Sequence, residues 1–230
     1  MAISETFYAS RELASQAAAQ HISSAIGVSL VDAAETAIIV TGGSSPVNCY
    51  ELLADTALPW HKVHVLISDD RCVPLDHEAS NEGMVRRLLA THCARDVRIV
   101  SIYNPKVPPE ETCAVLGAQM ESLPMPFSIS LLGMGVDGHF ASLFPDFAEL
   151  ESGLDEDGEE RCLPVQTSAS EYPRITLTMA TLIKSKEILL LFFGGDKREV
   201  YERAKLPDSE YPISRLLRQE QAPVHIIWAP

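Results

Sequence analysis

The sequence predicts an α/β protein whose mostly parallel sheet is covered by helices on both faces, as a three-layer, Rossmann-like domain. Short apolar runs alternate along the chain with amphipathic segments, in the order that parallel strands and crossover helices require. Several apolar runs end in glycine-rich or polar loops, as buried strands do. No repeat and no long linker divides the 230 residues, so we expect a single domain over residues 1–230.

Local patterns place the individual elements. Apolar residues near helical spacing predict an opening helix over residues 8–26. Ser45 followed by Pro46 marks a helix start, and Asp196 with Glu199 resembles a capping box. We expect strands at 37–40, 63–67, 97–103, the run before residue 133, 174–178, 187–193 and 224–228, and further helices at 46–54, 81–90, 110–122, 197–204 and 213–218.

Composition narrows the class of protein. The formal net charge of −14 argues against nucleic acid and anionic membranes as partners. Residues 149–160 contain seven acids and no base, which indicates a solvated surface loop. No apolar run has the roughly 18 residues of a membrane helix, and residues 1–10 lack the pattern of a signal peptide. The five cysteines show neither C-x-x-C nor metal spacing, so we expect reduced thiols in the cytoplasm.

The organising stretch is the loop that begins at Gly133, after an apolar run. Ligands of open α/β sheets bind beyond the carboxyl ends of the strands, where this loop is expected. Gly133, Gly135 and Gly138 have the bare spacing of a dinucleotide fingerprint, but the loop comes past mid-chain and holds an acid and an imidazole inside the glycine frame. We interpret it as a catalytic loop, with His139 as candidate base and Asp137 as the carboxylate that orients it.

Two further segments are candidates for binding an anion. Gly42, Gly43 and Ser44 lie in a strand-to-helix turn at residues 41–46, which fits a phosphate cradle and an ordinary tight turn equally well. No Gly-Lys-Ser/Thr follows, so the turn is not a Walker A loop. Lys197 begins an expected helix, where a cation is unfavourable unless an anion lies between it and the helix dipole.

Asp69, Asp70 and Arg71 follow the strand expected at residues 63–67. Adjacent residues on a strand point to opposite faces, so the two acids make a poor metal or acid pair. The local pattern alone favours a solvated turn with an internal Asp–Arg pair. Ser142 lies in no G-x-S-x-G elbow, so the sequence does not support a serine hydrolase.

The run from Gly133 to Pro145 resembles the signature of the 6-phosphogluconolactonase family. That family hydrolyses 6-phosphogluconolactone in the oxidative pentose phosphate pathway, and its sister family, the glucosamine-6-phosphate deaminases, shares the Asp-Gly-His core. The deaminases continue with Asn-Glu-Pro, whose Glu assists ring opening, whereas this sequence has Leu143 and Phe144 before Pro145. The resemblance covers most of the chain and implies the three-layer α/β fold that both families share.

The resemblance also implies roles for particular residues. It implies that the 41–46 turn holds the substrate phosphate and that Arg71 and Lys197 also contact this phosphate. It places Arg174 near the sugar phosphate and gives Asp69 a supporting role. The deaminases have no arginine at the position of Arg71.

The implied reaction needs neither a metal nor an organic cofactor. His139 takes a proton from water, which attacks the C1 carbonyl of 6-phospho-D-glucono-1,5-lactone, and protonated His139 then serves the leaving ring oxygen. Backbone N–H groups of the glycine-rich loop are expected to receive the negative charge. The expected partner is a small sugar-phosphate lactone, and the expected assembly is a monomer or a homodimer.

Two alternatives are kept beside the lactonase. An amino-sugar-phosphate isomerase/deaminase is disfavoured by Leu143, Phe144 and Arg71. A non-catalytic sugar-phosphate-binding regulator predicts a damaged base loop, whereas Asp137 and His139 are both present.

Overall fold

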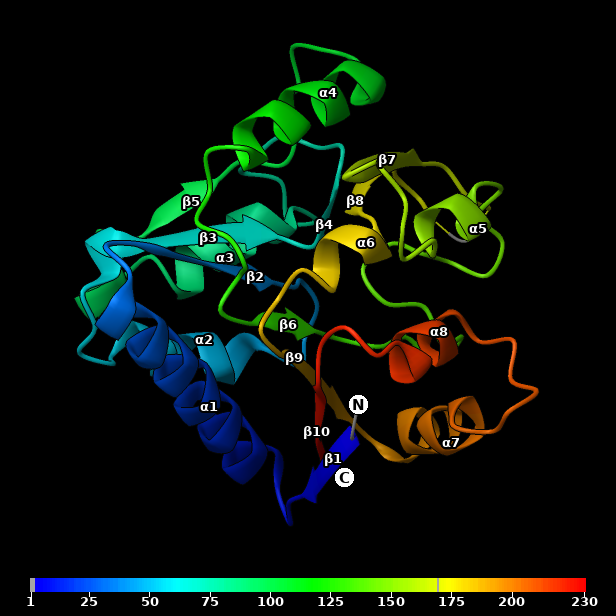
Figure 1. Ribbon diagram of the computed structural model, residues 1–230, viewed down its shortest axis with the longest axis horizontal. Coiled ribbons are helices and arrows are strands. Elements are labelled where there is room, and N and C mark those ends of the chain that lie inside the picture. The colour runs from blue at the N-terminus through cyan, green and yellow to red at the C-terminus, as the bar shows by residue number, and fades with distance from the viewer. Residues whose placement is uncertain (1–2, 169) are drawn as a thin grey trace.

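Seven parallel strands form the main sheet of the computed structural model, which describes residues 3–168 and 170–230 (Figure 1). In sheet order they are β1 (Ile3–Phe7), β10 (Val224–Ala229), β9 (Ile188–Phe193), β6 (Ser130–Leu132), β2 (Thr36–Val40), β3 (Val63–Ile67) and β5 (Arg98–Val100). Every residue of β2 is buried, as expected for a central strand covered on both faces.

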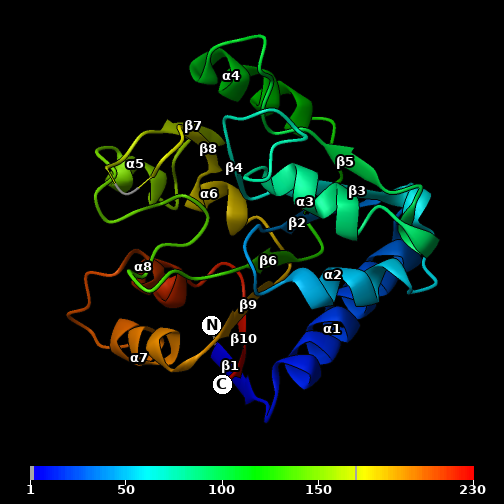
Figure 2. The same ribbon diagram turned by 180° about the vertical axis from the view of Figure 1, so that it is seen from behind.

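Helices cover both faces of this sheet, so the predicted three-layer α/β architecture is confirmed. On one side lie α1 (Arg11–Asp32), α2 (Val47–Ala54) and α3 (Asn81–Leu88), and on the other lie α4 (Pro109–Met120), α6 (Met179–Leu182), α7 (Gly195–Ala204) and α8 (Pro212–Arg218) (Figures 1 and 2). Single turns of 3₁₀ helix occur at Trp60–Lys62 and His92–Ala94.

A second, antiparallel sheet was not predicted. It consists of β4 (Asp69–Arg71), β8 (Arg174–Leu177) and β7 (Cys162–Val165), in that order. The expectation of a solvated turn at Asp69–Arg71 is therefore wrong: the segment pairs with β8, and Asp69 and Asp70 are 4% and 2% exposed. The strand that pairs with β4 lies about a hundred residues further along the chain, so no local pattern reveals it.

The N-terminal region differs from the sequence expectation. Residues 3–7 form edge strand β1, whose mostly exposed side chains give no apolar run. The helix expected at 8–26 begins only at Arg11, where Ser10 Oγ accepts a hydrogen bond from the Leu13 N–H at 3.3 Å, and it continues to Asp32. Met1, Ala2 and Ala169 lie outside the described residues.

Two expected helix starts are also wrong. Helix α2 begins at Val47 with Pro46 as its N-cap and no side-chain cap, so Ser45 does not cap it. Helix α7 begins at Gly195, one residue before the expected Asp196 cap, because Gly194 has a φ of +93° and turns the chain into the helix without a side-chain cap.

The acidic segment 149–160 is a surface loop, as predicted, with the short helix α5 (Leu150–Gly153) inside it. None of the described helices combines the length and the apolar character needed to cross a membrane. All five cysteines are free thiols, which agrees with the prediction for these residues.

Candidate active site

A pocket of about 180 Å³ lies at the carboxyl edge of the main sheet, among the loops that follow β2, β3, β6 and β9. This is the edge where open α/β sheets bind ligands. The pocket brings together residues from six segments of the chain, and every predicted site residue except Asp137 lines it. Its lining comprises Thr41, Gly42, Gly43, Ser44, Ser45, Asp69, Arg71, Asn81, Gly133, Met134, Gly135, His139, Ala141, Arg174 and Lys197.

His139 is held by Asp137, which lies behind it in the same loop. The His139 Nδ1 to Asp137 Oδ1 distance is 2.5 Å, and the His139 N–H donates to the same oxygen at 3.3 Å. Burial acts to raise the pKa of Asp137, but the hydrogen bond and the charge of His139 outweigh it and leave that pKa below its usual value. An ionised carboxylate only accepts hydrogen bonds, so neutral His139 carries its proton on Nδ1 and has a lone pair on Nε2.

The glycines of this loop leave room for the imidazole. A side chain at Gly135 would overlap the ring of His139 and the carboxylate of Asp137, and the Gly135 N–H donates to the His139 carbonyl at 2.9 Å. Gly138 has a φ of +77° and lies against Tyr211. On its other side the imidazole packs on Phe144, with ring centroids 4.3 Å apart. The position of the imidazole is therefore fixed by packing as well as by Asp137.

We expect Gly135→Ala to lower kcat for the lactone hydrolysis that the family resemblance implies at least 10-fold, because the added methyl group displaces the imidazole from Asp137. Gly27→Ala is the matched control: a Cβ at Gly27, in the middle of α1, meets nothing within 4 Å, so this variant keeps full activity and gains helix stability. Steady-state kinetics of the two purified variants make the comparison. Equal kcat in both would contradict the packing argument.

Asp69 belongs to a buried polar network beside the pocket. Its Oδ2 accepts a hydrogen bond from Ser142 Oγ at 2.6 Å and lies 3.7 Å from Arg174 Nη1. Burial lowers the pKa of Arg174, with Asp69 acting against that shift. The guanidinium carbon of Arg174 lies 5.0 Å from the centre of the Phe144 ring. Phe144 thus contacts both the candidate base and a candidate phosphate ligand.

Arg71 lines the pocket with part of its hydrogen-bonding capacity unused. Its Nη1 donates to the Ala79 carbonyl at 2.6 Å and to Asn81 Oδ1 at 3.2 Å. Its buried Nε has no hydrogen-bond partner among the described residues. A guanidinium with a free donor beside a pocket suits the oxygens of a phosphate.

The expected side-chain pair between an aspartate and Arg71 within β4 is wrong. Asp70 accepts hydrogen bonds from the backbone N–H groups of Asn81 and Glu82 at 2.7 and 2.9 Å, so it caps α3 instead of pairing with the Arg71 side chain. Burial raises the pKa of Asp70 to about 6, against the effect of these N–H groups.

The turn after β2 approaches the neighbouring segment closely. A Cβ at Gly42 would overlap the amide of Asn81, whose Nδ2 donates to the Asp69 carbonyl at 2.8 Å. Gly43 has a φ of +85°, which other residues adopt only with strain. Both glycines therefore have structural reasons to be there, and both also line the pocket.

Lys197 lies in the first turn of α7, as predicted, and lines the pocket. It forms no ion pair with the part of the chain that the structure describes, and burial lowers its pKa, partly offset by Asp137. The pocket therefore gathers Lys197, Arg71 and Arg174 around a single lining carboxylate, Asp69. A net charge of −14 repels anions from the chain as a whole, but the local positive charge of this pocket can attract one.

Sequence reasoning gave no site role to Asn81, Ser142 or Phe144. Asn81 begins α3 and bridges Arg71 to the backbone of Asp69. Ser142 is fully buried and donates to Asp69, a position that suits a structural hydroxyl and not a nucleophile. Their only sequence signal is their place inside stretches that resemble the lactonase family, which are residues 133–145 for Ser142 and Phe144 and residues 69–81 for Asn81.

The fold and this pocket define a class: an α/β protein whose pocket gathers cationic side chains beside a histidine–carboxylate pair. A family model described as glucosamine-6-phosphate isomerases/6-phosphogluconolactonase matches residues 9–228, and the chain belongs to this family. It is 37% identical to a 6-phosphogluconolactonase of Mesorhizobium japonicum over 85% of this chain and 82% of that protein. It is 36% identical to one of Pseudomonas aeruginosa, over 87% and 84%.

Solved structures agree with the sequence relatives. A 6-phosphogluconolactonase of Shewanella baltica superposes with a TM-score of 0.95 at 28% identity, covering 100% of this chain and 98% of the other. A monomeric glucosamine-6-phosphate deaminase has a TM-score of 0.78 at 18% identity, covering 98% and 97%, and shows that the deaminase shares the fold.

Proposed function

We propose that the chain hydrolyses 6-phospho-D-glucono-1,5-lactone to 6-phospho-D-gluconate in the oxidative pentose phosphate pathway, with His139 as the base. The family and its lactone-hydrolysing relatives support the reaction. The observation that carries the assignment of residues is the shared pocket. His139, backed by Asp137, lines the same cavity as Arg71, Arg174, Lys197 and the Gly42–Ser44 turn.

In the proposed reaction, His139 Nε2 takes a proton from water as the oxygen attacks C1 of the lactone. Asp137 keeps Nδ1 protonated and stabilises the imidazolium that forms. The tetrahedral intermediate then collapses, the bond from C1 to the ring oxygen breaks, and protonated His139 returns the proton to that oxygen. The acid so formed loses its proton to solvent.

In this proposal, the phosphate of the substrate lies in the part of the pocket that the Gly42–Ser44 turn and the cationic side chains form. The Gly42–Ser44 turn lies between β2 and α2, and Lys197 lies in the first turn of α7, so two helix N-termini and three cationic side chains surround the same cavity. In this scheme Asp69 is a positioning residue, because its buried carboxylate is bonded to Ser142 and lies near Arg174.

The expected oxyanion donors are fewer than the glycine count implies. Within the loop, the Gly135 N–H donates to the His139 carbonyl, the Gly138 N–H to the Gly135 carbonyl at 3.1 Å, and the His139 N–H to Asp137. These three groups already have acceptors. We therefore assign stabilisation of the oxyanion to the pocket-lining backbone at Gly133 and Met134.

Substrate comparison tests the proposal. With 6-phosphogluconolactone, formation of 6-phosphogluconate must exceed the spontaneous rate, whereas glucosamine 6-phosphate must release no ammonia. Leu143 and Phe144 are 0% and 4% exposed and carry no carboxylate where the deaminases place their glutamate, which favours the lactonase. Ammonia release without lactone hydrolysis would reverse the choice, and binding without turnover of either would support the regulator.

The affinity for the product should weaken at alkaline pH earlier than an ordinary lysine would allow. Burial lowers the pKa of free Lys197, and only its charged form attracts the phosphate. Binding is therefore strongest below that lowered pKa and falls as the pH rises through it. Calorimetric titration with 6-phosphogluconate checks this, and Lys197→Arg, which stays charged, should flatten the profile. Identical profiles in the two proteins would remove Lys197 from the phosphate site.

The remaining proposals concern context. We retain one domain over residues 1–230, a monomer or homodimer, and a cytoplasmic location, which the five free thiols support.

A further inference from the structure

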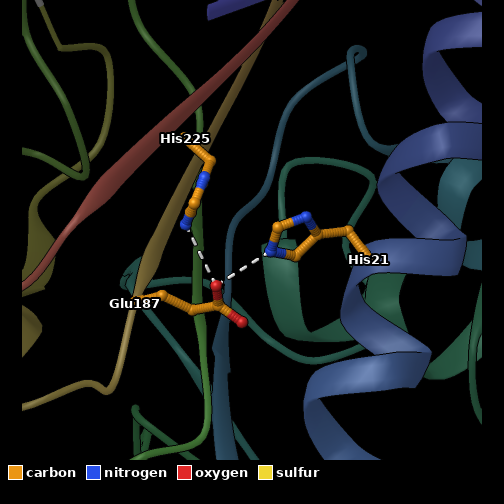
Figure 3. Close-up of side chains that lie close together, drawn as sticks. All are labelled: His21, Glu187 and His225. Carbon is orange, nitrogen blue, oxygen red and sulfur yellow. Dashed lines mark hydrogen bonds and ion pairs between the residues drawn. The ribbon is translucent and has the colours of Figure 1, made fainter. Parts of the chain in front are cut away.

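A cluster of three side chains that could ligate a metal ion lies at the amino ends of the strands, opposite the active-site pocket (Figure 3). His21 comes from α1, Glu187 directly precedes β9, and His225 is the second residue of β10. Strands β9 and β10 are parallel, so their amino ends meet at the same edge. The six residues of β9 separate this cluster from the Lys197 end by roughly 20 Å, so the cluster is not part of the active site.

Both imidazoles point to the same carboxylate oxygen of Glu187. His21 Nε2 lies 2.9 Å from Glu187 Oε2, and His225 Nε2 lies 3.1 Å from the same oxygen. The two imidazole centroids are 4.9 Å apart, and one ligand atom from each of the three residues lies within 4.8 Å of the others. The side chains are 30%, 22% and 30% exposed for His21, Glu187 and His225, so they are held in place but still reachable.

Two imidazoles and one carboxylate are a ligand set that suits Zn²⁺. Zinc bonds of about 2.0–2.2 Å with tetrahedral geometry place neighbouring ligand atoms about 3.4 Å apart. The observed 2.9 and 3.1 Å separations reach that value if the side chains move outward by a few tenths of an ångström. Three protein ligands leave the fourth position to water or to a small ligand.

A neighbouring hydroxyl can orient one of the two imidazoles. Ser4 Oγ lies 2.5 Å from His225 Nδ1, so it can accept a hydrogen bond from Nδ1–H. The lone pair of Nε2 is then available to an ion, and outer partners of metal-bound histidines hold the ring in this way.

An entry path and the local charge are also compatible with an ion. His21 and Glu187 line a pocket of about 440 Å³, so an ion can reach the cluster from solvent. The only Lys or Arg in that lining is Lys186, whose Nζ is held by Ser29 Oγ at 3.0 Å. The two ion pairs of Glu187 in the described chain are with the two histidines, so no lysine or arginine competes with a cation for its carboxylate.

We propose that His21, Glu187 and His225 form a second site, which binds one Zn²⁺ ion and ties helix α1 to the amino ends of β9 and β10. The ion joins segments that are far apart in the sequence, and it binds the folded chain only, because the unfolded chain does not hold the three ligands together. It therefore stabilises the fold without taking part in lactone hydrolysis. At a zinc concentration about a hundredfold above Kd, Tm should rise by roughly 5–10 °C.

Metal counting after equilibrium dialysis against Zn²⁺ tests the site. We expect one equivalent bound to the wild type and to His139→Ala, which lacks the active-site imidazole, and none bound to His21→Gln or His225→Gln. His64→Gln is the matched control: His64 Nε2 also lies 2.9 Å from a carboxylate, Glu35, but without a second histidine. This variant should keep the zinc and its Tm shift.

Circular dichroism checks that each variant is folded. Glu187→Gln removes the third proposed ligand while nearly keeping the shape of the side chain, and it should also bind no zinc. Visible absorption typical of four-coordinate Co²⁺ should appear in the wild type and be absent from His21→Gln. Lactone hydrolysis should stay within about twofold of the wild type in His21→Gln, so the outcome does not depend on the proposed activity. Zinc binding that persists in His21→Gln and His225→Gln, or that is absent from the wild type, would show that the cluster is only a hydrogen-bonded network.

Discussion

Replacing His139 by alanine is expected to lower kcat for lactone hydrolysis by about 10²–10⁴-fold, because the variant has no group that takes the proton from water. The affinity for 6-phosphogluconate should change little, since the phosphate ligands lie on other segments of the pocket. Stopped-flow measurement of proton release gives kcat, and calorimetry gives the affinity. A variant that keeps wild-type kcat would leave the reaction assigned but the mechanism wrong.

Asp137→Asn separates the chemical role of the base from its orientation. The amide keeps the shape of the side chain but removes the negative charge that holds Nδ1–H and stabilises the imidazolium. We expect a smaller loss than in His139→Ala. A loss as large as that in His139→Ala would mean that the two residues act as a single unit.

Replacing Arg71 by methionine is expected to raise KM by about 10–100-fold, which corresponds to losing one or two charge-assisted hydrogen bonds to the phosphate. Methionine keeps much of the length and apolar volume of arginine. It removes the Nη1 group, which donates hydrogen bonds to the Ala79 carbonyl and to Asn81 Oδ1, and the unpaired Nε. Arg71→Lys should lie between wild type and Arg71→Met, because lysine keeps the charge but not the planar fork.

Unphosphorylated glucono-1,5-lactone provides the internal control for this prediction. Its hydrolysis should be slow in the wild type and no slower in Arg71→Met, because the interaction that the variant loses is absent from this substrate. Arg98→Met is the matched surface control, since Arg98 pairs with Glu35 far from the pocket. If Arg71→Met slowed both lactones equally, the residue would act on the fold or on the base and not on the phosphate.

Much of the fold was predictable from the sequence because parallel strands buried on both faces leave continuous apolar runs. The segment at 36–40 is such a run and occupies the middle of the sheet. Strand β1 was not predictable, because an edge strand with exposed side chains has no such run. The start of α7 was misplaced because Gly194 turns the chain through its backbone conformation, without the side-chain cap that sequence patterns reveal.

The site was predicted to a different extent. His139 and Lys197 stood out locally, one in a glycine-framed loop and the other at a helix start that disfavours a cation. Arg71 and Arg174 had no distinctive local pattern, and their roles came from the family resemblance. Pairing between β4 and β8 brings them to one pocket, with the partners Arg71↔Arg174 directly opposite each other. The contact between Ser142 and Asp69 joins residues 73 positions apart and has no local signature.

The most direct test of the central claim is the rate of 6-phosphogluconate formation from freshly generated 6-phosphogluconolactone, followed through 6-phosphogluconate dehydrogenase at several concentrations of the wild-type chain. We predict a rate that rises in proportion to the concentration of the wild-type chain and exceeds spontaneous hydrolysis by orders of magnitude. His139→Ala at the same concentrations should lower the rate above the spontaneous background by about 10²–10⁴-fold. A wild-type rate equal to spontaneous hydrolysis at every concentration would contradict the central claim.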